Sequence, residues 1–181
     1  MLLALAQEFA RSAYKCSEWP KDVQLVGRIN MKHLNNAIRS YAAYDNLSET
    51  PILLIVNDIM WKRGEKGLLM TDRNLYFNIN GRGTKELRED TSIYVDPIPP
   101  YYEDNGELED KSKYRLFLDT LDLGTSFTFS SNVYALSLFL DAMYRRCIIS
   151  DELVSGFFSP DQFSPLVFKF RNEGVHDLFS L

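Results

Sequence analysis

The side chains best suited to chemistry are the basic residues between positions 61 and 88. This stretch carries seven Lys or Arg against three Asp or Glu, in a chain whose net charge is −5. Three of the seven, Lys62, Arg63 and Lys66, lie in one charged turn beside Trp61, and residues 61–66 are named the basic loop. Lysine and arginine hold phosphate through charge-assisted hydrogen bonds. The basic loop is therefore a candidate site for a phosphate or an anionic lipid headgroup; the alternative is that it is solvated, or paired with an acidic loop.

The acidic residues gather in a second stretch, 103–110, which invites comparison with a calcium loop. An EF-hand loop opens with an Asp and closes with a Glu at its twelfth position. Tyr101 and Ser112 occupy those two positions here. The stretch is therefore interpreted as a solvated loop. Gly81-Arg82-Gly83 has no Lys-Ser or Lys-Thr after it, so it is interpreted as a hairpin tip and not as a phosphate-binding loop.

A catalytic pair could be drawn from Cys16 or Cys147 with His33 or His176. A nucleophilic thiol needs partial exposure in an electropositive setting, with its base beside it. Cys147 falls on the apolar side of a predicted helix, and Cys16 lies at the end of another helix with no motif around it. Two histidines are also few for a metal site. We expect no enzyme activity, no cofactor and no metal.

The last segment of the chain, 151–181, is rich in phenylalanine. It allows two interpretations: the rings fold back onto the core, or they form an interface with a partner or a second copy. The candidate interface residues are Trp61, Phe157, Phe158, Phe163 and Phe168. A strand at 166–170 could also add to an exposed sheet edge.

Helices and strands are predicted from the spacing of apolar residues. Helices are expected at 2–15, at 30–44 with Asn30 as N-cap, and from Ser130 or Ser131 to 147. The apolar stripe of the third helix consists of Val133, Leu136, Leu140, Met143 and Cys147. Strands are expected at 52–56, 67–71, 75–79, 84–87, 91–95, 114–118 and 126–129. Turns are expected at 72–74, at the Asn80-Gly81 hairpin signal and at Leu123-Gly124. Residues 97–113 are expected to form a loop, because its prolines cannot donate ladder hydrogen bonds.

Length and composition narrow the class of protein. The chain has 181 residues, of which 45% are hydrophobic, as in one globular domain with an appendage. Its acidic balance argues against nonspecific binding to nucleic acid, which relies on neutralising phosphates. No apolar run is long enough to span a membrane, and the N-terminus lacks a positively charged start, so a cytoplasmic location is expected. Two isolated cysteines are expected to be reduced.

Two stretches carry a family resemblance. GLLMTDRNLYF at 67–77 and PILLIVNDIMWKRGEKG before it resemble the first strands of bacterial pleckstrin-homology-like (PH-like) and GRAM-like domains. The resemblance covers about 50–150. It implies an α+β fold, a PH-like antiparallel barrel or half-barrel with a C-terminal helix, preceded by two N-terminal helices. The chain would then consist of an N-terminal helical segment at 1–49, a PH-like domain at 50–150 and an aromatic-rich C-terminal tail at 151–181.

The resemblance implies a range of functions, because PH-like folds host lipid binding, peptide binding and scaffolding. In the eukaryotic members the loop between the first two strands supplies Lys and Arg to inositol phosphates, and Lys62, Arg63 and Lys66 would occupy that loop here. The leading expectation is a non-catalytic protein–protein interaction or scaffolding module that associates with itself or with a protein partner. The alternative is anionic lipid headgroup or phosphate binding through the basic loop. An enzyme is the third hypothesis.

Overall fold

The computed structural model describes residues 1–17, 19–43, 45–57, 66–79, 81–98, 113–123 and 130–146. These residues form two antiparallel sheets and three helices. The larger sheet has the order β1 (Val23–Leu25), β2 (Ile52–Asn57), β3 (Gly67–Thr71), β4 (Asn74–Asn78) and β5 (Arg82–Glu86). The smaller sheet has the order β6 (Ile93–Ile98), β7 (Lys113–Leu118) and β8 (Leu121–Asp122).

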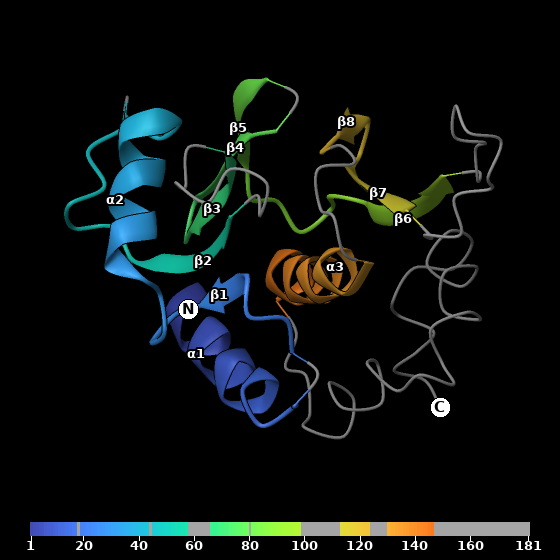
Figure 1. The fold of residues 1–181 in the computed structure, drawn as a ribbon, viewed down its shortest axis with the longest axis horizontal. Coiled ribbons are helices and arrows are strands. Elements are labelled where there is room, and N and C mark those ends of the chain that lie inside the picture. The colour runs from blue at the N-terminus through green and yellow to red at the C-terminus, as the bar shows by residue number, and fades with distance from the viewer. Residues whose placement is uncertain are drawn as a thin grey trace, which may run out of the picture.

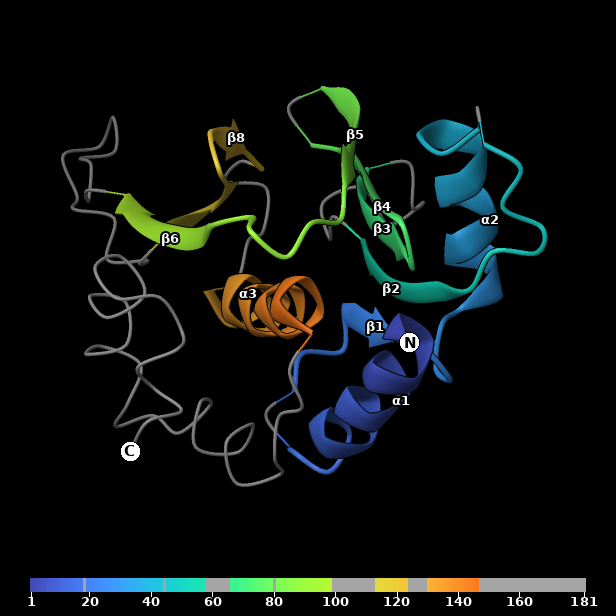
Figure 2. The same ribbon diagram turned by 180° about the vertical axis from the view of Figure 1, so that it is seen from behind.

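The three helices are α1 (Leu2–Ala13), α2 (Met31–Ser40) and α3 (Ser130–Arg145). Helix α2 covers one face of the five-stranded sheet, and α1 and α3 lie on the other side (Figures 1 and 2). Alternate strand residues point to opposite faces. Leu69 accordingly packs in the cluster under α2, while Leu68 and Met70 join the cluster that contains α1 and α3. Every residue of β3 is buried, because both faces of the sheet are covered.

Helix α3 is buried more completely than its sequence predicts. The predicted stripe is buried from Val133 to Met143, but Ser137 and Asp141 are also buried. The reason is that α3 packs against α1 as well as against strands β6 and β7. The ring of Phe139 meets the ring of Phe9 of α1 edge to face, with centroids 5.1 Å apart. The predicted stripe is therefore confirmed from Val133 to Met143, and the burial of further residues follows from the additional contacts of α3.

The turns of the larger sheet follow the sequence signals. The hydroxyl oxygen of Thr71 accepts hydrogen bonds from the backbone N–H groups of Arg73 and Asn74, at 3.2 and 3.0 Å, which closes the β3–β4 turn. The β4–β5 hairpin is confirmed, with Asn78 paired to Arg82. Gly81 has φ of 144°, a conformation that L side chains rarely adopt.

Several details differ from the sequence-based expectations, among them the end of α2 at Ser40 instead of 44. Strands β1 and β8 were not predicted. Strand β6 continues through Pro97, where a loop was expected. Among the described strands β6 lies at an edge of its sheet, so the N–H that proline lacks can face away from the ladder. The turn after β7 is made by Asp119 and Thr120. The turn expected at Leu123-Gly124 falls partly outside the described residues. The strands expected at 126–129 and 166–170 lie outside the described residues.

The α+β prediction is confirmed. Within the described residues the five-stranded sheet is not closed into a barrel, so the PH-like barrel or half-barrel stays a prediction. The N-terminal segment contributes β1 to the sheet and α1 to the main core. None of the helices in the described part of the chain has the length and apolar character needed to cross a membrane.

Candidate functional site

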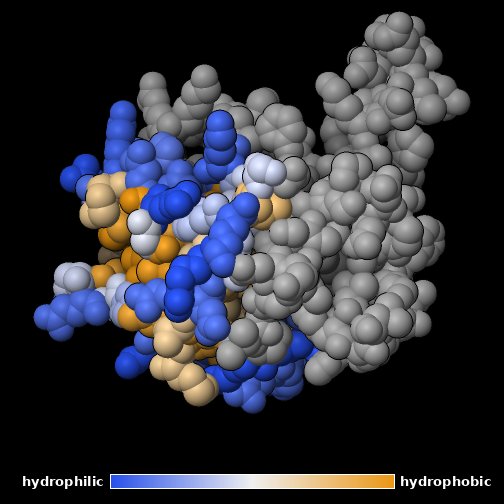
Figure 3. Space-filling view, turned by 90° about the horizontal axis from the view of Figure 1, so that it is seen from below, coloured by the Kyte–Doolittle hydropathy of each residue, from blue (hydrophilic) through white to orange (hydrophobic). Residues whose placement is uncertain are grey.

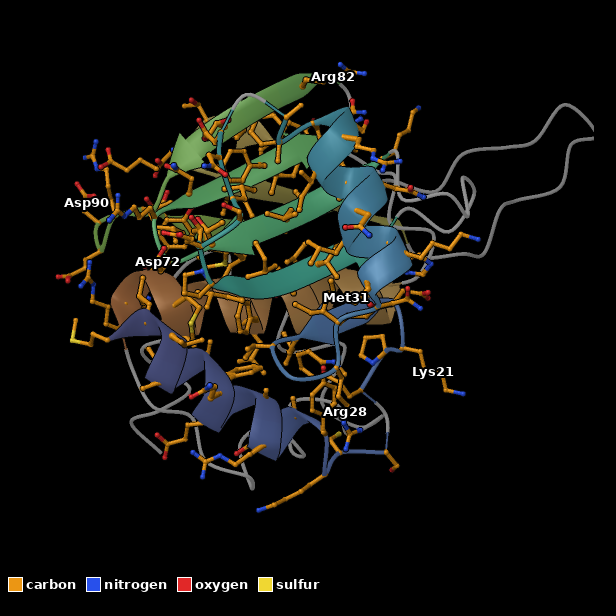
Figure 4. All side chains as sticks on the ribbon, turned by 90° about the vertical axis from the view of Figure 1, so that its left-hand side faces the viewer. Lys21, Arg28, Met31, Asp72, Arg82 and Asp90 are labelled. Atoms are coloured by element: carbon orange, nitrogen blue, oxygen red, sulfur yellow. The ribbon has the colours of Figure 1, made fainter. Side chains whose placement is uncertain are left out.

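A polar pocket lies at one end of the five-stranded sheet, between the sheet and the C-terminal end of α2. Its volume is about 460 Å³. It is named here the sheet-end pocket. The described residues that line it are Asn36, Arg39, Ser40, Lys66, Asn78 and Arg82. Arg82 lies beside the end of α2 that is farther from Met31 (Figure 4).

Strand pairing brings three of these residues to the same end of the sheet. Gly67 pairs with Asn78 across β3 and β4, and Asn78 pairs with Arg82 across β4 and β5. Lys66 directly precedes Gly67. Because β4 and β5 form a tight hairpin, Arg82 follows the turn at once and stays next to Asn78. The register of two hairpins thus places two cations and an amide side by side.

Helix α2 supplies the other wall. Its start is fixed by Asn30, whose side-chain oxygen accepts hydrogen bonds from the backbone N–H groups of Lys32 and His33, at 2.9 and 3.4 Å. The buried residues Leu34 and Ala37 hold the helix against the sheet. Helical periodicity then carries Asn36, Arg39 and Ser40 to the pocket. The last carbonyl groups of a helix are partly negative, and Arg39 in the last turn offsets that charge.

The electrostatics of the pocket favour an anion. Three cationic side chains converge on it, and none of the described lining residues is a carboxylate. Arg39 and Arg82 are exposed, and Lys66 is half-buried. Neither arginine forms an ion pair with a described carboxylate. The amide groups of Asn36 and Asn78 and the hydroxyl of Ser40 add hydrogen-bond donors, as an oxyanion requires.

The structure places one residue of the predicted phosphate site, Lys66, in this pocket. Lys62, Arg63 and Trp61 lie outside the described residues. So do the predicted interface residues Phe157, Phe158, Phe163 and Phe168. The anion site at the basic loop and the aromatic interface therefore stay predictions at those positions.

Sequence reasoning missed Arg39 as a site residue. It counted Arg82 in the basic stretch 61–88 but placed it at a hairpin tip and not in the candidate site. Arg39 belongs to a helix that precedes the basic stretch, and only packing of α2 on the sheet brings it to Lys66. A cation in the last turn of α2 was visible in the sequence, but it is common at helix ends for electrostatic reasons alone. No local signal connected it to the hairpins.

The thiols do not form part of this pocket in the described residues. Cys16 follows α1 as a buried thiol that forms no disulfide, and Nδ1 of His33 lies 3.3 Å from Nε2 of Gln24. Cys147 and His176 lie outside the described residues. The Cys–His nucleophile considered from the sequence gains no support from the positions of Cys16 and His33.

Comparisons with known protein families, with curated proteins and with solved structures found no match. The resemblance to PH-like and GRAM-like domains therefore remains a prediction from the sequence alone.

Proposed function

We propose that this chain is a non-catalytic binding module that holds a phosphate-bearing anion in the sheet-end pocket. The observation that carries the proposal is the convergence of Arg39 from α2, Lys66 from the residue before β3, and Arg82 from β5 on one cavity. A net-negative chain gains nothing in solubility from gathering cations at one place, and like charges held together repel one another. A bound anion would relieve that repulsion.

The lining groups favour binding over chemistry. Arginine remains protonated at every physiological pH and presents a planar fork that matches phosphate oxygens. Lysine adds a point charge, and the neighbouring amides and hydroxyl add hydrogen bonds without exchanging protons. Charge-assisted hydrogen bonds are stronger than neutral ones, but solvent screens those of the exposed residues Arg39 and Arg82. Three cations acting together are therefore needed to offset this screening and the unfavourable end of the α2 dipole.

The pocket is larger than a single phosphate needs, so the phosphate belongs to a larger molecule or to a membrane surface. A free phosphorylated molecule and a lipid headgroup offer the same oxyanion. Lys62 and Arg63 shortly precede Lys66 in the sequence, and as members of the basic loop they are expected to contribute to binding in either case. The two sources have to be separated by experiment.

The test uses the full chain with two probes. Isothermal titration with inorganic pyrophosphate measures binding of a free anion. Co-sedimentation with vesicles of phosphatidylcholine and phosphatidylserine measures binding to a lipid surface. We expect binding to at least one probe, with an affinity about tenfold or more lower in Arg82→Glu and in Arg39→Glu.

Arg73→Glu is the matched control, because it makes the same change of charge on an exposed arginine in the β3–β4 turn, away from the pocket. We expect it to bind as the wild type does. The proposal fails if neither probe binds, or if Arg73→Glu weakens binding as much as the two pocket variants do.

A further inference from the structure

A second cationic surface lies beside the C-terminal half of α1, between that helix and residues 19–30. It consists of two cavities of about 360 and 590 Å³. Tyr14 and Arg28 line both cavities, so the two adjoin on either side of this pair. Together they are named the α1 groove. The groove lies near the N-terminal end of α2, where Figure 4 shows Arg28 and Lys21, whereas Arg82 of the sheet-end pocket lies near the other end.

Arg28 is held in a defined position at the centre of the α1 groove. Its guanidinium carbon lies 4.2 Å from the centroid of the Tyr14 ring, in cation–π contact. The hydroxyl of Tyr14 donates a hydrogen bond to the carbonyl of Leu25 at 3.0 Å and accepts one from its N–H at 2.8 Å, which fixes the ring. Stacking occupies the face of a guanidinium and leaves the N–H groups at its edge available to a carboxylate.

The described lining of the groove carries charge of one sign. Arg11, Lys15, Lys21 and Arg28 line it, and none of the described lining residues is acidic. Of the carboxylates nearby in sequence, Glu8 and Asp22 are not among the lining residues, and Glu18 lies outside the described residues. In the described part of the chain Arg11, Lys21 and Arg28 form no ion pair. Figure 3, which views the molecule from the side of α1, shows hydrophilic side chains projecting around exposed apolar surface.

Apolar groups form the floor between these cations. Trp19 and Val23 are buried at one cavity, and Ala10 and half-buried Val26 line the other. The indole N–H of Trp19 donates to the carbonyl of Val23 at 2.9 Å, which holds the floor rigid. Aromatic and apolar groups surrounded by a polar, charged rim are the usual anatomy of a protein interaction surface.

We propose that the α1 groove binds an extended acidic segment of a partner protein. One carboxylate pairs with the edge of the Arg28 guanidinium, and flanking carboxylates reach Arg11 and Lys21. Side chains between them pack on Tyr14 and the apolar floor. The occupant is a chain and not a small anion, because the cations are spread over two cavities that only an extended ligand reaches together. Charge complementarity selects an acidic segment over a neutral or basic one.

The test measures fluorescence anisotropy of a labelled peptide of alternating Glu and Tyr, titrated with the full chain. The matched probe is the same peptide with Gln in place of Glu. We expect the Glu peptide to bind and the Gln peptide to bind at least about tenfold more weakly. Arg28→Glu should weaken binding of the Glu peptide about tenfold, and Arg28→Lys less, because lysine keeps the charge but loses the stacked fork.

Lys21→Glu is a second variant, at an exposed position outside the core, and it should weaken binding even if Arg28→Glu impairs folding. Arg73→Glu is again the control of equal charge and should bind the Glu peptide normally. Equal binding of the Glu and Gln peptides would overturn the proposal. So would an affinity that is unchanged in both groove variants, or vesicles of phosphatidylserine that bind through Arg28 while the Glu peptide does not bind.

Discussion

The ammonium group of Lys85, in β5, lies 2.7 Å from Oδ2 of Asp119, in the turn between β7 and β8. The other carboxylate oxygen of Asp119 accepts hydrogen bonds from the N–H of Ser92 at 2.8 Å and from its hydroxyl at 3.2 Å. The N–H of Asp119 in turn donates to the carbonyl of Ser92 at 2.8 Å. Asp119 thus connects the five-stranded sheet to the three-stranded sheet.

We expect Lys85→Met and Asp119→Asn each to lower the free energy of unfolding by about 0.5–1 kcal/mol. The double variant should lose less than the sum of the two, because the same ion pair is removed only once. Urea unfolding of the four proteins measures this coupling. Arg88 and Asp90 form a more exposed ion pair, with side chains that are 63% and 70% exposed. The same set of two single variants and one double variant at Arg88 and Asp90 should show no measurable coupling. Strict additivity at Lys85 and Asp119 would rule out a stabilising link between the sheets.

The same carboxylate predicts a dependence on pH. The hydrogen bond from Lys85 lowers the pKa of Asp119 below its usual value, and the hydrogen bonds from Ser92 act in the same direction. Because the pKa is lower in the folded state, the stabilisation is complete above about pH 4, the unfolded value, and is lost as the pH falls through the folded pKa. Wild type should therefore lose more stability between pH 5 and pH 3 than Asp119→Asn does. Parallel losses in urea unfolding would contradict the assignment.

Gly83 of β5 faces Phe77 of β4 across the hairpin. A Cβ atom at Gly83 would lie 2.3 Å from Cζ of the Phe77 ring, which is impossibly close, so the ring would have to move. We expect Gly83→Ala to destabilise the protein by about 1–3 kcal/mol, as overpacking does. Phe77→Leu removes the atom that clashes, so Gly83→Ala should cost less in that background. An equal cost in both backgrounds, measured by urea unfolding, would show that the ring is not the cause.

The N-cap of α2 supports one wall of the sheet-end pocket. Asn30→Ala should lower the free energy of unfolding by about 1 kcal/mol, because the N–H groups of Lys32 and His33 lose their acceptor. Asn30→Ser keeps an oxygen at that place and should retain most of the stability. Thermal unfolding by circular dichroism compares the two. If Ser and Ala variants melt alike, the side chain does not act as a cap.

Local patterns predicted most of the elements. The apolar spacing of α1, the cap at Asn30 and the hairpin signal at Asn80-Gly81 each reflect interactions between residues close in sequence. Strand β1 was missed because its three residues carry too short a pattern, and pairing with β2 from another part of the chain defines it. Strand β8, with two residues, is defined in the same way by β7.

The candidate sites were only partly predictable for a related reason. Lys66 was identified because it lies in a run of basic residues. The residues next to Arg39 and Arg28 in the sequence form no recognisable motif. Tertiary packing brings Arg39 to the ends of the hairpins and Arg28 to the ring of Tyr14. Asp119 was likewise unremarkable in sequence, because its partners Lys85 and Ser92 come from distant segments.

The most direct test of the central claim is a titration of isotope-labelled full-length protein with inorganic pyrophosphate, followed through backbone amide chemical shifts. Binding in the sheet-end pocket predicts saturable shifts that cluster at Arg39, Ser40, Asn78 and Arg82 and that vanish in Arg82→Glu. Absence of saturable shifts, or shifts confined to residues around Arg28 in the α1 groove, would contradict the assignment of the sheet-end pocket as the anion site.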